Sequence, residues 1–107
     1  MELNQVKQRF SEVKRYIDNA VTACENSNAP DELKESLREL NQQSDEAKQF
    51  VEQAEDEDQI RESVDSLEEL GDRATQAMRQ AGNIDQQLQD AVFQVHDAIS
   101  QLKHQLH

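Results

Sequence analysis

Four segments of the chain repeat apolar residues at alternating steps of three and four positions, the spacing typical of helices that pack side by side. The sequence holds two glycines and one proline, which are too few turn-forming residues for a protein built from β-hairpins. A net charge of −12 and a mean hydropathy of −1.00 favour disorder. A disordered chain, however, has no reason to keep apolar residues at this regular helical spacing. The stripes run over residues 3–24, 33–54, 60–81 and 84–102.

The breaks between the stripes predict where the helices end. A helix continued past Ala54 would swing its apolar face by about 100° before the next stripe begins at Ile60, so we expect a turn between them. Gly82 suits the end of the third helix, because glycine readily adopts the left-handed conformation that closes helices. The predicted helices are residues 2–27, 30–54, 57–81 and 83–106.

Residues at the breaks also match the usual start of a helix. Pro30 suits the first helical position, where a backbone N–H would have no partner. A polar cap followed three residues later by Gln forms a capping box, in which each residue bonds the other's backbone. Two pairs fit this pattern, Asp56 with Gln59 and Asn83 with Gln86.

Helices of about 24 residues are about 36 Å long, and short connections force neighbouring helices to run antiparallel. We therefore expect residues 1–107 to form one all-α domain, an antiparallel up-down-up-down four-helix bundle. The alternative is a pair of long hairpins that meet in a homodimer. A weak 27-residue repeat links the first three helices, and packing does not require its charged columns. These columns are Lys7, Lys34 and Arg61, and Asp18, Asp45 and Asp72.

Acidic residues concentrate in the central half of the chain. Residues 29–55 and 56–81 each carry eight acidic and three basic groups, whereas residues 1–28 are neutral. Because phosphate binding needs a basic surface, nucleic acid is disfavoured as a partner. The reverse hypothesis stays open, in which an acidic bundle imitates DNA and binds a basic protein. The densest acidic cluster is Glu55, Asp56, Glu57 and Asp58.

No group of residues predicts a catalytic site, a cofactor or a metal centre. A di-iron bundle needs Glu three residues before His on two helices, but Phe93 precedes His96 and Gln101 precedes His104. A closed structural zinc site needs four ligands, and the sequence offers three histidines on one helix. The most closely spaced pair, His104 and His107, lies at the end of the sequence, where helices fray.

His96 supports one enzymatic alternative, a histidine phosphotransfer component. Domains of that class are small helical bundles with an exposed histidine, and His96 lies beside the apolar stripe of the last helix. The adjacent Asp97 would repel an incoming phosphoryl group. Fold analogy alone is weak support, so we rank this hypothesis second.

The leading hypothesis is a non-enzymatic protein that acts by binding another protein or a second copy of itself. Tyr16, Phe50, Leu70 and Phe93 fall beside the narrow stripes, where they either widen the core or face a partner. The last helix has the widest apolar face, and the acidic cluster would favour a basic partner. The predicted partner surface is Val92, Phe93, Ile99 and Leu106.

The sequence also predicts the compartment. Cys24 is the single cysteine, so the chain has no internal disulfide framework, and its place on the first stripe suits a small apolar residue. The chain shows no charged-then-apolar leader and no apolar run near the ~18 residues that span a bilayer. We therefore expect a soluble cytoplasmic protein without membrane contact.

Overall fold

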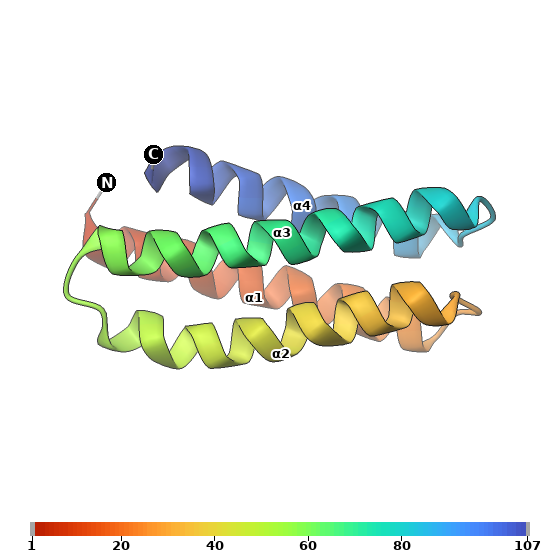
Figure 1. The fold of residues 1–107 in the computed structure, drawn as a ribbon, viewed down its shortest axis with the longest axis horizontal. Helices are drawn as coiled ribbons and strands as arrows, with labels where there is room; N and C mark the ends of the chain where they lie inside the picture. Colours follow the sequence, from red (N-terminus) through yellow and green to blue (C-terminus); the bar gives the residue numbers. More distant parts are fainter. Residues whose placement is uncertain (1, 107) are drawn as a thin grey trace.

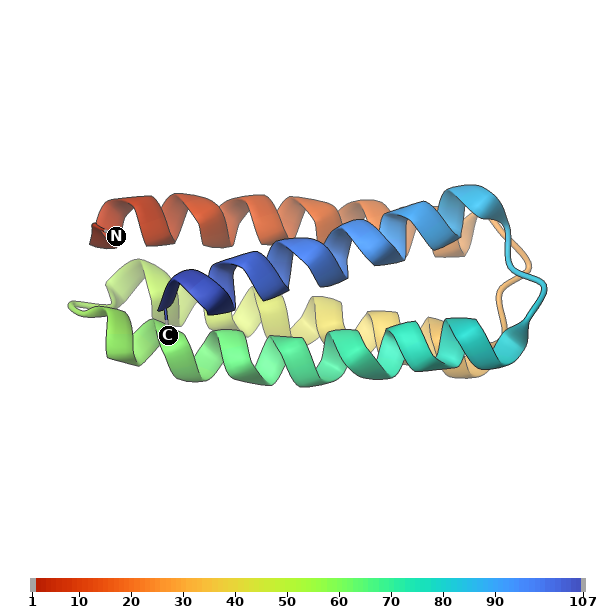
Figure 2. The same cartoon turned by 90° about the horizontal axis from the view of Figure 1, so that it is seen from above.

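The four apolar stripes become the inward faces of four antiparallel helices in the computed structural model, which describes residues 2–106 (Figure 1). Each helix packs against two neighbours, in the ring order α1, α2, α3, α4. The bundle measures 42 × 21 × 17 Å, and both chain ends lie at the same end of it (Figures 1 and 2). The all-α four-helix prediction is therefore confirmed. The helices are α1 (Leu3–Glu25), α2 (Asp31–Gln53), α3 (Glu57–Ala81) and α4 (Gln86–Leu106).

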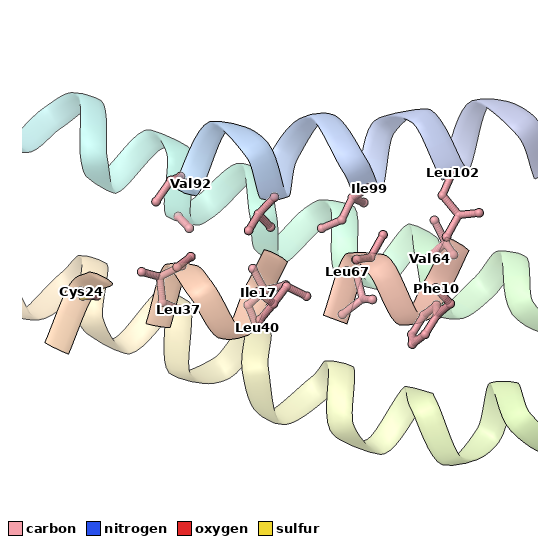
Figure 3. Close-up of a cluster of buried hydrophobic side chains, with 14 of the residues drawn as sticks. Phe10, Ile17, Cys24, Leu37, Leu40, Val64, Leu67, Val92, Ile99 and Leu102 are labelled. Carbon is pink, nitrogen blue, oxygen red and sulfur yellow. The ribbon is translucent and has the colours of Figure 1, made fainter. Parts of the chain in front are cut away.

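Most of the core consists of residues that the stripes identified, although Ala81 of the third stripe is exposed and Ala77, outside it, is buried. The α1 stripe from Val6 to Cys24 is at most 3% exposed, and all four helices contribute side chains to the same interior (Figure 3). Burial raises the pKa of the Cys24 thiol, because a thiolate is poorly solvated there, so Cys24 fills space as an apolar residue does. Ser44 is also fully buried, and its hydroxyl donates a hydrogen bond to the Asn41 carbonyl at 2.7 Å.

The turn between α2 and α3 forms as expected. The Asp56 carboxylate accepts a hydrogen bond from the Gln59 backbone N–H at 3.0 Å, and the Gln59 side chain accepts one from the Glu55 N–H at 3.0 Å. The first bond satisfies a backbone donor that the first turn of α3 leaves free, and the second satisfies a donor in the preceding turn. Gly82 ends α3 with a φ of +79°. The Asp56 cap and the glycine stop are thus confirmed, whereas Gln59 bonds the backbone of Glu55 rather than that of Asp56, so the predicted capping box forms only in part.

Two predicted helix starts are wrong. Pro30 lies just before α2 as its cap rather than as its first residue. The last helix begins at Gln86, three residues later than predicted, because the Asp85 carboxylate accepts a hydrogen bond from the Gln87 N–H at 2.8 Å and supplies the cap. Asn83 therefore stays in the connection between α3 and α4, and the capping box predicted for it does not form.

In each of the two hairpins, α1–α2 and α3–α4, a cation near the start of the first helix binds a backbone carbonyl at the end of the second helix. In α1–α2, the Lys7 ammonium donates a hydrogen bond to the Glu52 carbonyl at 3.1 Å. In α3–α4, the Arg61 guanidinium donates two to the Leu106 carbonyl, at 3.0 and 2.6 Å. Each contact spans 45 residues and places a cation at the negative end of a helix. Lys7 and Arg61 lie 54 residues apart, so these contacts repeat by hairpin, at twice the predicted 27-residue period.

Lys14 forms a second link between α1 and α2. Its side chain is 12% exposed, and its ammonium donates to Asp18 at 2.6 Å, Asn41 at 2.5 Å and Asp45 at 2.9 Å. Burial alone would lower the pKa of Lys14, but the hydrogen bonds and charges of Asp18 and Asp45 outweigh burial and raise it. The folded protein therefore holds this proton more tightly than the unfolded chain does.

This raised pKa predicts how stability depends on pH. The contribution of Lys14 is complete below the ordinary lysine pKa of 10.5 and is lost as the pH rises through the higher folded value. The free energies of unfolding of the wild type and Lys14→Met are to be compared by urea denaturation at pH 8 and pH 11. We expect an advantage of the wild type at pH 8 that shrinks at pH 11. An advantage of equal size at both values would assign it to packing of the alkyl chain instead.

Gly71 offers a stabilising substitution. It lies inside α3, and a Cβ added there would meet Ile99 Cδ1 at 3.5 Å, an ordinary contact distance. Gly71→Ala is therefore expected to raise the free energy of unfolding by roughly 0.5–1 kcal/mol, since alanine restricts the unfolded chain. Gly82→Ala is the matched control, because its φ of +79° disfavours alanine and the change should destabilise. Denaturant unfolding measures both, and a loss of stability in Gly71→Ala would contradict the prediction.

No helix within residues 2–106 has both the length and the apolar character that crossing a membrane requires.

Candidate partner-binding surface

The partner surface predicted on the last helix is wrong for three of its four residues. Val92 and Ile99 are 1% exposed and Leu106 is 3% exposed, so all three belong to the core. The reason is that α4 packs against both α1 and α3, and two neighbours need a wider apolar stripe than a single seam does. Only Phe93 of that set reaches the surface.

The exposed large apolar residues lie on different sides of the bundle. Tyr16 is 37% exposed and lines a groove between α1 and α4. Phe93, 38% exposed, lies one turn before His96, which faces α3. Phe50, the most exposed at 51%, lies in the last turn of α2. Because they are separated, these residues do not make one apolar patch of the kind that marks a large interface.

Phe50 adjoins a groove between α2 and α3. The groove has a volume of about 220 Å³, and small side chains form much of its floor. Phe50 follows Glu46 by four residues and Ala47 by three, so it lies one turn along the same side of α2. We call this side of the bundle the α2–α3 face. The groove is lined by Gln43, Glu46, Ala47, Ser63, Ser66 and Leu67.

Four exposed carboxylates lie along the α2–α3 face. Glu46 lines the groove, and Glu39 precedes it by seven residues on the same side of α2. Glu62 and Glu69 flank the groove residue Ser66 at helical spacing on α3. None of the four takes part in an ion pair within residues 2–106. Arg73 lies one turn beyond Glu69 and is a nearby cation. Because the four carboxylates outnumber this arginine, the face has an excess of negative charge.

Between α3 and α4, by contrast, the Glu68 carboxylate is paired with a cation. Glu68 accepts a hydrogen bond from the Lys103 ammonium at 2.5 Å, and this bond, with nearby negative charges, raises the pKa of Lys103. Asp72 lies 3.1 Å from His96 Nε2. Glu68 therefore differs from the four carboxylates of the α2–α3 face, which form no ion pair on the side of the bundle where Phe50 is exposed.

The predicted acidic cluster has a structural role in the α2–α3 turn. Asp56 caps α3, and Asp58 forms an ion pair with Arg61 at 3.3 Å. Glu57 and Asp58 lie in the first turn of α3, where negative charge stabilises the positive end of the helix. The cluster directly follows the last turn of α2 and so extends the acidic surface beyond Phe50.

The geometry around His96 disfavours phosphotransfer. Its Nε2 lies 3.1 Å from Asp72 and its Nδ1 lies 3.8 Å from Asp97, so a carboxylate faces each ring nitrogen. Both would repel a phosphoryl donor, and Asp72 would have to be displaced. Within residues 2–106, no three His, Cys, Asp or Glu side chains converge to hold a metal ion. His107, which the sequence paired with His104, lies outside the described residues.

Sequence reasoning found Phe50 but missed the face around it. The available signal was the pair of seven-residue steps, Glu39 to Glu46 and Glu62 to Glu69, because residues seven apart share a helix face. Which of these carboxylates keep an excess charge depends on contacts that only the fold shows. Comparison of the chain with protein-family models, curated proteins and solved structures gives no match. Function is therefore inferred from the chemistry of the surface.

Proposed function

We propose that this protein is a non-enzymatic binding protein that recognises a basic partner protein through the α2–α3 face. One observation carries the proposal: the most exposed aromatic residue, Phe50, lies one turn from Glu46, one of four exposed carboxylates on this face that form no ion pair within residues 2–106. An aromatic anchor surrounded by charge is a common composition for a protein interface. The cytoplasm stays the proposed compartment, since one cysteine gives no disulfide framework for an oxidising one.

The two components of the face have different roles. Burial of the Phe50 ring would supply affinity, because large aromatic side chains dominate interface energetics. The carboxylates would accelerate association with a positively charged partner and make binding sensitive to salt. The same charge opposes a homodimer through this face, since two copies of a chain with net charge −12 repel each other. We therefore propose a different protein, rather than a second copy, as the partner.

Site-specific photocrosslinking in cells tests the proposal. A photoreactive phenylalanine analogue is placed at Phe50 in one variant and at Phe93 in another, so that the exposed aromatic on the α3–α4 side serves as the matched control. We expect a discrete adduct with a basic protein from position 50 and none of that mass from position 93. Equal adducts at both positions, or none at position 50, would overturn the proposal. An adduct of twice the chain mass would indicate self-association instead.

Affinity for the crosslinked partner should then depend on both components. Phe50→Ser is expected to weaken binding by roughly thirtyfold, the effect of losing an aromatic hot spot. Replacing Glu39, Glu46 and Glu62 together by Gln is expected to slow association and flatten the salt dependence. Isothermal titration and stopped-flow mixing at 50 and 300 mM salt measure these effects. Affinity unchanged by both salt and the triple substitution would exclude charge recognition.

The identity of the partner decides the alternative role as an acidic DNA mimic. In that case the crosslinked protein would bind nucleic acid through the surface that meets Phe50. Competition with duplex DNA for the purified partner would then displace this protein. A partner that binds both ligands at once would exclude mimicry while leaving the binding proposal intact.

A further inference from the structure

The groove of the α2–α3 face lies between two helices that run side by side and antiparallel (Figure 1). Its volume is about 220 Å³, and its lining includes three small side chains, Ala47 of α2 with Ser63 and Ser66 of α3. Small side chains allow a further helix to approach closely, since packed helices lie about 8–10 Å apart depending on the residues between them. The groove is therefore open to a helix of another molecule that lies along it.

Phe50 continues the line of this groove. It follows Gln43 by seven residues and Ala47 by three, so it lies one turn beyond the groove residues on the same side of α2. Its side chain is 51% exposed, and a helix lying along the groove would cover the ring. The exposed apolar group of the face thus lies on the path that such a helix would take.

Carboxylates lie on both sides of the groove at a step of seven residues. Seven residues make two helical turns, so the two carboxylates on each helix are about 10.5 Å apart along its axis. All four are exposed, and none takes part in an ion pair within residues 2–106. The pairs are Glu39 with Glu46 on α2, and Glu62 with Glu69 on α3.

The carboxylates of the two helices alternate along the groove. Because α2 and α3 are antiparallel, Gln43 and Leu67 lie at the same end of the groove. Glu69 follows Leu67 by two residues, so its level along the bundle falls between those of Glu39 and Glu46. A helix in the groove would therefore meet carboxylates from its two sides in turn.

The seven-residue step also determines the shape of a matching segment. A partner helix has the same rise per residue as α2, so basic residues seven apart on it would meet Glu39 and Glu46 together. In an extended segment the same distance of about 10.5 Å corresponds to about three residues, which point to opposite faces. An extended segment could therefore not present basic residues to both carboxylates from one side.

We propose that the segment recognised by the α2–α3 face is a basic amphipathic helix that lies along this groove, an inference that rests on the proposed function. Apolar residues at steps of three and four would pack on Ala47 and cover Phe50. Lysine or arginine residues at steps of seven would flank this apolar stripe and meet Glu39 and Glu46 on one side and the α3 carboxylates on the other. Charge complementarity thus selects a basic helix, whereas a second copy of this chain, with net charge −12, is repelled.

Three synthetic peptides test the proposal, with binding measured by fluorescence anisotropy at about 150 mM salt. The matched peptide is a helix of roughly 21 residues, with leucine and alanine at steps of three and four and lysine at steps of seven on both sides of that stripe. The shifted peptide has the same composition, but its lysines lie opposite the stripe. The third peptide is the matched one with a central neutral residue replaced by proline, which breaks the helix.

We expect the matched peptide to bind at least about tenfold tighter than the other two. Because all three carry the same charge, this difference reports geometry rather than the attraction of any polycation to an acidic protein. Equal affinity of the three peptides would overturn the helix inference but leave charge recognition, and so the proposed function, standing. Absence of binding by the matched peptide would also overturn it, whereas the crosslink from Phe50 tests the proposed function whatever the shape of the partner.

Variants of the protein show whether the peptide lies in the groove. Ser66→Gln places a longer neutral side chain in the groove, and Ser11→Gln makes the same change at an exposed site of α1 as the matched control. We expect Ser66→Gln to weaken binding of the matched peptide about tenfold or more and Ser11→Gln to change it less than about twofold. Equal effects of the two substitutions would place the peptide elsewhere and overturn the proposal.

Charge reversal tests the pairing itself. Glu39→Lys/Glu46→Lys should weaken binding of the matched peptide at least about tenfold, because like charges would then face each other along α2. A peptide whose lysines on one side of the stripe are replaced by glutamate should restore the affinity for this variant and bind the wild type poorly. Failure of this peptide to restore binding would contradict a helix aligned with α2.

Discussion

Phe10→Ala is expected to lower the free energy of unfolding by about 3–5 kcal/mol, the typical cost of emptying a buried aromatic site. Phe10 is 1% exposed, whereas the other two phenylalanines, Phe50 and Phe93, are at the surface. With no tryptophan in the chain, Phe10 is the bulkiest side chain of a core otherwise filled mainly by Leu, Ile, Val and Ala. It lies at the same level along the bundle as Val64 and Leu102 (Figure 3), so its loss would affect several helices.

Urea unfolding followed by circular dichroism measures this loss. A domain of this size has a total stability of roughly 5–15 kcal/mol, so the variant should be largely unfolded well below the wild-type midpoint. Phe50→Ala is the matched control, because it removes the same atoms from a site that is 51% exposed. We expect the control to cost less than about 1 kcal/mol. Equal losses in the two variants would mean that Phe50 is buried against a second molecule.

The sequence predicted the core and the helix breaks because both follow from local periodicity. A stripe of apolar residues identifies the inward side of a helix whatever it packs against, and Asp56 with Gln59 determines a helix start through contacts three residues apart. The start of α4 was misjudged because Asn83 and Asp85 are both acceptable caps. Choosing between them depends on how the connection crosses the end of the bundle.

Long-range contacts are where periodicity stops being informative. The bond from Lys7 to the Glu52 carbonyl depends on the register of α1 against α2, which no local pattern contains. The same holds for the ion pair of Glu68 with Lys103, which the carboxylates of the α2–α3 face lack. The candidate face was therefore only partly predictable: Phe50 stood out beside the stripe, but the excess charge around it did not.

Ile99→Ala is expected to cost about 2–5 kcal/mol, whereas Phe93→Ser should cost less than about 1 kcal/mol. Both residues belong to the partner surface predicted for α4. Ile99 represents the part of that surface that is buried, and Phe93 represents the part that is exposed. Ile99 is 1% exposed, and its Cδ1 would lie 3.5 Å from a Cβ at position 71. Phe93 is 38% exposed, so its replacement leaves little empty space behind.

Denaturant unfolding and light scattering on both variants test this division. If α4 formed an interface between copies of the chain, Phe93→Ser would change the measured mass and destabilise more than a surface substitution does. The double variant Gly71→Ala/Ile99→Ala adds a local test, because the alanine methyl at position 71 would fill part of the cavity left by Ile99. Its loss of stability should therefore be smaller than the sum of the single effects. An additive result would place Ile99 away from Gly71 and contradict the packing of α4 against α3.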